Sequence, residues 1–250
     1  MDHRSAINDW PGPRARIGLI IPSVNTLTEP QFNRYAPPGV EIHVTRVRID
    51  IPFVEQLPKV LEAAALLADA RCDVIVYHCT GKSMEAGLAA ERRMVAAIGE
   101  ATGVPSASTA TAILEALRVL GARRLVLTSP YTQQTNDKER AFLAEAGITV
   151  LHDRAMDLPV PDGMCGAPPD YWVRVTEEAA DPSADGYFVS CTNIQAIEAI
   201  PELEQRLGKP VITSNQATLW YCLRTCGMDQ DVPQLGRLFR LGLPEVAAVR

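Results

Sequence analysis

The chain has 250 residues, of which 47% are hydrophobic, so it can bury a substantial core as one large domain or two small ones. Its formal net charge of -6 leaves no basic stripe, which argues against a nucleic-acid-binding protein. No apolar run approaches the roughly 20 residues that span a bilayer, and the polar, Pro-containing N-terminus is unlike an export signal, so we expect a cytoplasmic protein without a membrane partner.

Two matched segments are short apolar runs that end in proline. Residues 16–22 (RIGLIIP) are typical of a buried parallel strand that proline stops. Residues 124–130 (RLVLTSP) repeat the Arg-to-Pro spacing and the apolar middle, and a helical pattern over 137–146 follows. The two segments therefore predict equivalent strands.

A second pair of segments, 73–80 (DVIVYHCT) and 185–192 (DGYFVSCT), places Cys79 and Cys191 where two strands run out. In a third pair, 103–121 and 208–227, a strand leads through a Ser/Thr-rich turn into a helix that ends at glycine. All three pairs occur in the same order, about 105 to 112 residues apart. This order indicates an internal duplication with pseudo-twofold symmetry.

Amphipathic helices are predicted between the strands, over 54–70, 84–99 and 194–207, and this alternation is typical of parallel α/β sheets. We expect an α/β fold of two pseudo-symmetric, doubly wound lobes. The first lobe is predicted over 1–120, joined by a C-terminal helix in 214–250, and the second over 121–213.

Ligand sites of open parallel sheets lie beyond the carboxyl ends of the strands. The loops that follow Pro22, Cys79, Pro130 and Cys191 should therefore converge on one cleft between the lobes. The Pro- and Gly-rich segment 159–169 is interpreted either as a flap over that cleft or as a plain connecting loop.

A cysteine at a strand end, near the N-terminus of the next helix, is expected to have a lowered thiol pKa because helix-end N–H groups favour the thiolate. Cys79 and Cys191 would approach a ligand from opposite faces, which suits proton removal and return, or thiolate addition to an activated double bond. For either cysteine alone, a small buried apolar residue is the alternative. The other four cysteines are interpreted as packing residues or bystanders, and with six cysteines and no CxxC pair we expect reduced thiols.

The sequence offers no pattern for a cofactor or metal. The segment from Gly81 to Ser83 lacks the earlier glycine of a phosphate-binding loop, no GxGxxG follows the first strand, and the four histidines are scattered. Chemistry is therefore expected from side chains and backbone alone. The candidate substrate-binding groups are hydroxyls, amides and N–H groups of the strand-end loops, each of which is also a typical cap or turn residue: Ser23, Asn25, Thr80, Gly81, Tyr131, Thr192 and Asn193.

At these residues the chain resembles the maleate cis-trans isomerase and arylmalonate decarboxylase group of the aspartate/glutamate racemase superfamily. The resemblance is carried by 16–25 (RIGLIIPSVN), 129–131 (SPY), 189–191 (VSC) and 208–211 (GKPV). It implies two four-stranded α/β lobes, a carboxylate-binding first loop that matches Ser23 and Asn25, a carboxylate-binding Tyr131, and a proton-donating Cys191. Cys79 matches the isomerase nucleophile, where the decarboxylases carry glycine.

The match at Cys79 favours two-cysteine chemistry, isomerisation or racemisation, over pure decarboxylation. We therefore expect a cofactor-independent isomerase that acts on a small dicarboxylate with two opposed cysteines, and a small mono- or dicarboxylate is the expected class of binding partner. The segment 80–83 (TGKS) departs from the isomerases and resembles the hydroxyl-lined dioxyanion pocket of the decarboxylases. An aspartate/glutamate or hydantoin-type racemase, an arylmalonate-type decarboxylase and a non-catalytic carboxylate-binding protein stay open as alternatives. So does assembly into a homo-oligomer.

Overall fold

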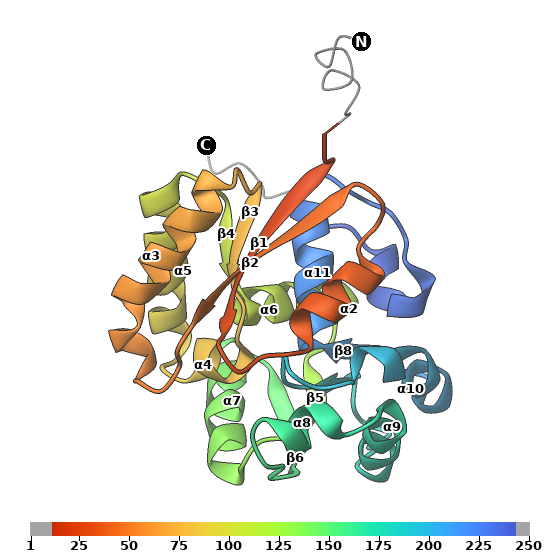
Figure 1. Cartoon of the computed structure of the whole chain (residues 1–250). Coiled ribbons are helices and arrows are strands. Elements are labelled where there is room, and N and C mark those ends of the chain that lie inside the picture. Colours follow the sequence, from red (N-terminus) through yellow and green to blue (C-terminus); the bar gives the residue numbers. More distant parts are fainter. Residues whose placement is uncertain (1–11, 244–250) are drawn as a thin grey trace.

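The computed structural model describes residues 12–243, which form two four-stranded parallel sheets, ordered β2-β1-β3-β4 and β6-β5-β7-β8 (Figure 1). The first sheet consists of β1 (Ala15–Pro22), β2 (Val40–Val47), β3 (Val74–Tyr77) and β4 (Ser106–Ser108). The second consists of β5 (Arg124–Ser129), β6 (Thr149–Ala155), β7 (Gly186–Val189) and β8 (Val211–Thr213). The predicted fold class is confirmed.

The two sheets share their strand order and the register of their central pairs, whereas β5 and β6 shift by one residue between Leu125 and Val126, where β1 and β2 do not. In the first sheet Ile17 of β1 pairs with Val74 of β3, and in the second Leu125 of β5 pairs with Gly186 of β7. In each lobe an aspartate directly before the third strand binds the backbone of the first strand, because the N–H of Arg16 donates to Asp73 at 2.7 Å and that of Arg124 donates to Asp185 at 2.9 Å. The sequence repeat is therefore a structural repeat with pseudo-twofold symmetry.

Helices cover both faces of the first sheet (Figure 1). The helices are α2 (Thr28–Tyr35), α3 (Leu57–Asp69), α4 (Thr80–Met84), α5 (Leu88–Thr102), α6 (Thr109–Leu120) and α11 (Ser214–Thr225). The predicted helix over 84–99 is wrong in its extent, because Gly87 takes a φ of 82° and separates α4 from α5. The predicted helix over 54–70 corresponds to a 3-10 turn, η1 (Phe53–Glu55), followed by α3.

The second sheet is flanked by α7 (Gln133–Glu145), α8 (Asp162–Gly166), α9 (Pro169–Glu178) and α10 (Ile200–Leu207). The helix α7 begins before the predicted 137, because the Thr132 side chain accepts from the N–H of Thr135 and caps it. The predicted helix over 194–207 is a 3-10 turn, η2 (Ile197–Ala199), and then α10, and the irregular 159–169 segment contains α8.

The C-terminal part of the chain returns to the first lobe. There α11 packs against α6 and α2, and two 3-10 turns follow, η3 (Pro233–Leu235) and η4 (Arg237–Arg240). The predicted C-terminal helix therefore ends at Thr225 within the described residues. The outer ends of the predicted lobe boundaries, 1–11 and 244–250, lie outside the described residues.

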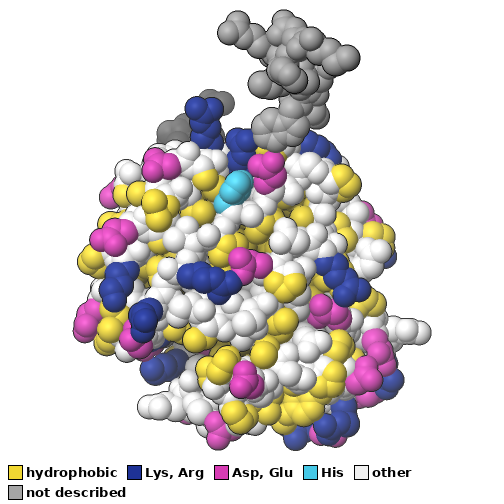
Figure 2. Space-filling view, in the orientation of Figure 1, with side chains coloured by type: hydrophobic (Ala, Val, Ile, Leu, Met, Phe, Trp, Pro, Cys, Tyr) yellow, Lys and Arg dark blue, Asp and Glu magenta, His cyan; other side chains and the backbone are white. Residues whose placement is uncertain are grey.

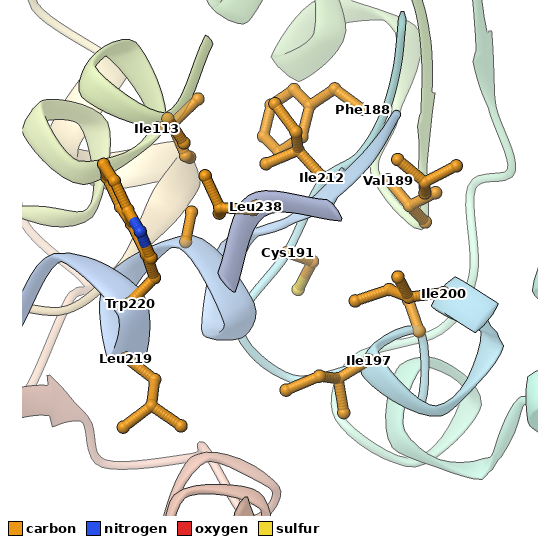
Figure 3. Packing of buried hydrophobic residues seen from close by; sticks show 14 of the residues in the cluster. Ile113, Phe188, Val189, Cys191, Ile197, Ile200, Ile212, Leu219, Trp220 and Leu238 are labelled. Carbon is orange, nitrogen blue, oxygen red and sulfur yellow. The ribbon is translucent and has the colours of Figure 1, made fainter. Parts of the chain in front are cut away.

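The two lobes share one core. Side chains alternate across β1, so Leu19 joins a large apolar cluster that also contains Leu125 and Phe188 of the second lobe, while Ile20 faces a smaller cluster under α3 and α5. Figure 3 shows Cys191 among the labelled side chains of the large cluster, with Ile197 nearby. Burying one such aliphatic side chain contributes about 1.5 to 3 kcal/mol, so the shared cluster holds the lobes, and the strand ends between them, in a fixed relation.

Charged side chains of both signs are interspersed over the face shown in Figure 2. Among residues 12–243, no helix has the length and apolar character needed to cross a membrane.

Candidate active site

A cavity of about 590 Å³ lies between the lobes, at the carboxyl ends of β1, β3, β5 and β7. The predicted convergence of the four strand-end loops is therefore observed. The segment after β6 adds one wall of the cavity. The lining residues are Pro22, Val24, Asn25, Ile49, Cys79, Gly81, Lys82, Glu85, Pro130, Tyr131, Thr132, Thr135, Lys138, Asp157, Leu158, Pro159, Val160, Met164, Cys191, Thr192 and Asn193.

Both cysteines line this cavity and are only 8% (Cys79) and 6% (Cys191) exposed. Burial raises the pKa of Cys79 to about 12 and that of Cys191 to about 11. The Tyr131 hydroxyl and the N–H of Asn193, which lies 3.3 Å from the Cys191 sulfur, offset part of the rise for Cys191. The prediction of lowered thiol pKa values is wrong, because desolvation exceeds what the five-residue helix α4 and the loop N–H groups supply.

Cys191 has a φ of 130°, a backbone conformation that favours glycine. The Cys191 N–H donates to the Ser214 Oγ at 3.1 Å, and the same Oγ accepts from the Thr80 hydroxyl at 2.8 Å. Ser214 therefore links the loop after Cys79 to the loop that contains Cys191, and it helps to hold the strained residue.

Two asparagines join the lobes across the cavity. The Asn25 Nδ2 donates to both the carbonyl and the hydroxyl of Thr192 at 3.1 Å, and its Oδ1 accepts from the N–H of Thr28 at 2.9 Å. The Asn193 Oδ1 accepts from the N–H of Thr26 at 2.8 Å. Both residues border the cavity, as predicted, but the Asn25 Nδ2 and the Asn193 Oδ1 already bind the opposite lobe.

Two predicted substrate-binding residues do not line the cavity. Ser23 is exposed, and its N–H and carbonyl bond to β2. Thr80 is fully buried, and its hydroxyl points to Ser214. Gly81 and Tyr131 do meet at the cavity wall, where a Cβ on Gly81 would lie 3.8 Å from the Tyr131 hydroxyl.

A buried histidine network supports the Cys79 side and was not predicted. His78 is fully buried, its Nδ1 lies 2.9 Å from the Thr109 hydroxyl, and its Nε2 lies 2.9 Å from the Asn215 Oδ1. Burial lowers the pKa of His78 to about 4, so the ring is neutral at physiological pH. The Asn215 Nδ2 donates to the Thr192 carbonyl at 3.1 Å and extends the network to the other lobe.

The sequence repeat itself could have identified two residues that support the cysteine loops. Thr109 and Ser214 occupy matched positions, each directly after a residue that forms a capping box, Ser108 in α6 and Thr213 in α11. Thr109 contacts His78, the residue before the first cysteine, while Ser214 contacts Cys191 itself. Both residues lie within the third matched pair of segments, directly after the fourth strand of each lobe, so comparing that pair residue by residue would have pointed to both hydroxyls.

The charged groups of the cavity wall are balanced. The Lys82 Nζ lies 2.6 Å from Glu85 and 3.1 Å from the Ile51 carbonyl, and the Lys138 Nζ lies 3.5 Å from Glu85. Asp157 is the second acidic residue in the lining. A carboxylate in this cavity would therefore depend on hydroxyl and N–H donors rather than on an unpaired cation. In the described part of the chain, no cluster of three or more His, Cys, Asp or Glu side chains is arranged to hold a metal ion.

Comparisons with known proteins agree with this geometry. The model of the arylmalonate decarboxylase family matches residues 44–239. The chain is 30% identical to the arylmalonate decarboxylase of Bordetella bronchiseptica over 89% of this chain and 95% of that protein. It is 31% identical to a maleate isomerase of Nocardia farcinica over 90% of this chain and 95% of that protein.

A solved structure of the Nocardia farcinica maleate cis-trans isomerase superposes with a TM-score of 0.81 at 26% identity, covering 90% of this chain and 98% of that chain. That structure is a cysteine-to-serine variant with a covalently bound succinylcysteine intermediate.

Proposed function

The chain belongs to the arylmalonate decarboxylase family, and on that basis we propose that it is a cofactor-independent isomerase that converts a small cis-dicarboxylate of the maleate type into its trans isomer. The observation that carries the proposal is the pair of buried thiols, Cys79 and Cys191, which reach one cavity from matched positions in opposite lobes. The succinylcysteine of the Nocardia farcinica enzyme is the adduct that a thiolate would form with maleate.

In the proposed reaction the Cys79 thiolate adds to one alkene carbon. The S–C bond forms, the π electrons move to the neighbouring carbon, and the Cys191 thiol gives that carbon its proton. Rotation about the new single bond follows. The Cys191 thiolate then removes a proton, the double bond re-forms in the trans geometry, and the C–S bond breaks. Both cysteines return to their starting states, so no redox partner is needed.

We assign the substrate carboxylates to the strand-end loops. The Tyr131 hydroxyl and the Gly81 backbone meet on one wall and the Thr192 hydroxyl lies on another, so these groups act directly. Asn25 and Asn193 act by holding the two lobes around the substrate.

A second candidate is an arylmalonate-type decarboxylase, in which Cys191 alone would protonate the carbon that loses carbon dioxide. The lining of the cavity favours it, because it includes the apolar side chains of Val24, Ile49, Leu158, Val160 and Met164. Apolar lining residues fit an aryl substituent, which maleate lacks.

Proton NMR in deuterated buffer tests the two candidates together, with maleate, phenylmalonate, aspartate and glutamate as substrates. Fumarate from maleate supports the isomerase. Phenylacetate from phenylmalonate without fumarate from maleate would replace it with the decarboxylase, and deuterium at the α-carbon of an amino acid would replace it with a racemase.

Variants connect the activity to the two thiols. Cys79→Ala should lower fumarate formation by about 10³-fold or more, whereas the matched control Cys226→Ala, a thiol outside the cavity, should leave it unchanged. In Cys191→Ser the carbanion would take its proton from water or from the serine hydroxyl, and no thiolate would then remove it, so the variant incubated with maleate should retain a succinyl adduct on the peptide that contains Cys79. An adduct on another residue would contradict the assignment.

A further inference from the structure

A buried carboxyl group next to the Cys191 loop has no part in the proposed reaction. Glu139 of α7 is fully buried, and its Oε1 accepts from the Ser190 hydroxyl at 3.0 Å. Its Oε2 is also buried and has no hydrogen-bond partner among the described residues. An unpaired buried carboxylate would cost several kcal/mol, so the neutral form is favoured at this position.

The charged side chains on the elements around α7 are already paired. On α4, Lys82 and Glu85 bind each other. On β6, Asp153 binds Arg140 at 3.0 Å. None of these groups forms an ion pair with Glu139 in the described residues. The titratable groups that a charge on Glu139 would affect are Cys79, Tyr131 and Cys191 of the cavity.

Burial raises the pKa of Glu139 to about 8, so the carboxyl group is largely protonated at neutral pH. A negative charge on it would raise the pKa of both thiols further, because like charges oppose each other in a buried site. The neutral carboxyl group is therefore the state that permits thiolate formation most readily.

Glu139 also fixes the residue before Cys191. The Ser190 N–H donates to the Thr128 carbonyl at 2.8 Å and its hydroxyl donates to Glu139, so Ser190 is held on both sides. The next residue, Cys191, adopts the strained φ of 130°. Strained conformations persist only where the surrounding structure holds them, and Ser190 and Ser214 both help to anchor this one.

We propose that Glu139 is a positioning residue: as a neutral carboxyl group it anchors Ser190, holds Cys191 in the cavity, and keeps negative charge away from the two thiols. The role in turnover rests on the proposed function, in which Cys191 donates the proton. The effect on thiol chemistry does not depend on the substrate.

The test is the pH dependence of Cys191 alkylation by iodoacetamide in the full-length protein, read by peptide mass spectrometry. Glu139→Gln keeps an oxygen that accepts from Ser190 but cannot ionise. Above pH 8 Glu139 ionises in the native protein, so the rate of Cys191 alkylation should rise less than tenfold per pH unit. In Glu139→Gln the rate should keep rising tenfold per pH unit, so the variant should react several times faster than the native protein near pH 9. Asp137→Asn, an exposed charge removal on the same helix, should follow the native profile.

Turnover gives the second readout. Glu139→Gln should keep kcat at pH 7 within about threefold, and Glu139→Leu, which cannot bind Ser190, should lose about tenfold or more in kcat with little change in KM. An alkylation profile of Glu139→Gln that superimposes on the native one would overturn the proposal. So would equal losses of kcat in Glu139→Gln and Glu139→Leu. If none of the tested substrates is converted, the alkylation profile still tests the role of Glu139, so a failure of the proposed function can be distinguished from a failure of this proposal.

Discussion

Removal of the Ser214 hydroxyl tests how firmly the two cysteine loops are joined. The Ser214 Oγ accepts from the Cys191 N–H at 3.1 Å and from the Thr80 hydroxyl at 2.8 Å, and all three residues are buried. In Ser214→Ala both donors lose this acceptor. A buried donor without a partner costs about 1 to 3 kcal/mol, so for the two donors we expect the free energy of unfolding to fall by about 2 to 6 kcal/mol.

Urea unfolding followed by circular dichroism at pH 7 measures this loss. Ser106→Ala is the matched control, because that half-buried hydroxyl donates only to the Val104 carbonyl, two residues away. Its loss should stay within about 1 kcal/mol. Ser214→Ala should also lower isomerisation, since the strained Cys191 loses an anchor. Equal free energies of unfolding for the two variants would refute the bridging role of Ser214.

Three further predictions concern pH. Because the pKa of Cys79 is about 12, kcat/KM for isomerisation should rise about tenfold per pH unit from about pH 6 to 8, and a flat pH–rate profile would count against a thiolate nucleophile. The folded-state pKa of Glu139, about 8, lies above its ordinary value of 4.5, so the native protein should lose stability as the pH rises from 4.5 through 8. Urea unfolding at pH 5 and pH 8 should show this loss of about 3 to 5 kcal/mol in the native protein and not in Glu139→Gln. The folded-state pKa of His78, about 4, lies below its ordinary value of 6.5, so stability that is present above pH 6.5 is lost as the pH falls through 4. The loss is about 3 kcal/mol in the native protein, and His78→Gln should lack most of it. The same dependence of the free energy of unfolding on pH in both proteins, measured by urea titration, would contradict this prediction.

Much of the fold was readable from the sequence because the repeat marks its strand ends. The strands before Cys79 and Cys191 carry continuous apolar runs, which buried parallel strands require. The outer strands β2 and β6 are only partly buried and mix polar with apolar residues, so their patterns are weak and they were missed. The break at Gly87 depends on a backbone angle that periodicity does not report.

The candidate site was predicted less completely than the fold. Strand-end position located Cys79 and Tyr131, but the degree of burial decides the thiol pKa, and burial depends on the packing of the opposite lobe. Ser214 was missed although the repeat matches it with Thr109, whose hydroxyl contacts the residue before Cys79. Glu139 was missed because it acts on Ser190, which lies far away in sequence, and a hydrogen bond of this kind has no local pattern.

The two lobes surround Cys79 and Cys191 with different residues, although the lobes repeat the same fold, and this difference bears on the mechanism. Before Cys79 stands His78, a neutral ring held by the Thr109 and Asn215 side chains. The matched position before Cys191 is Ser190, which is held by a buried carboxyl group.

The backbones of the two cysteines differ as well. Cys79 is extended, with a φ of -154°, whereas Cys191 is strained, with a φ of 130°. A racemase that exchanges a proton between two equivalent thiols has no need for such unequal surroundings. An isomerase in which one cysteine forms a bond to carbon and the other moves a proton requires two different environments. The asymmetry within a symmetric frame therefore supports distinct roles for Cys79 and Cys191, with Glu139 serving the second of them.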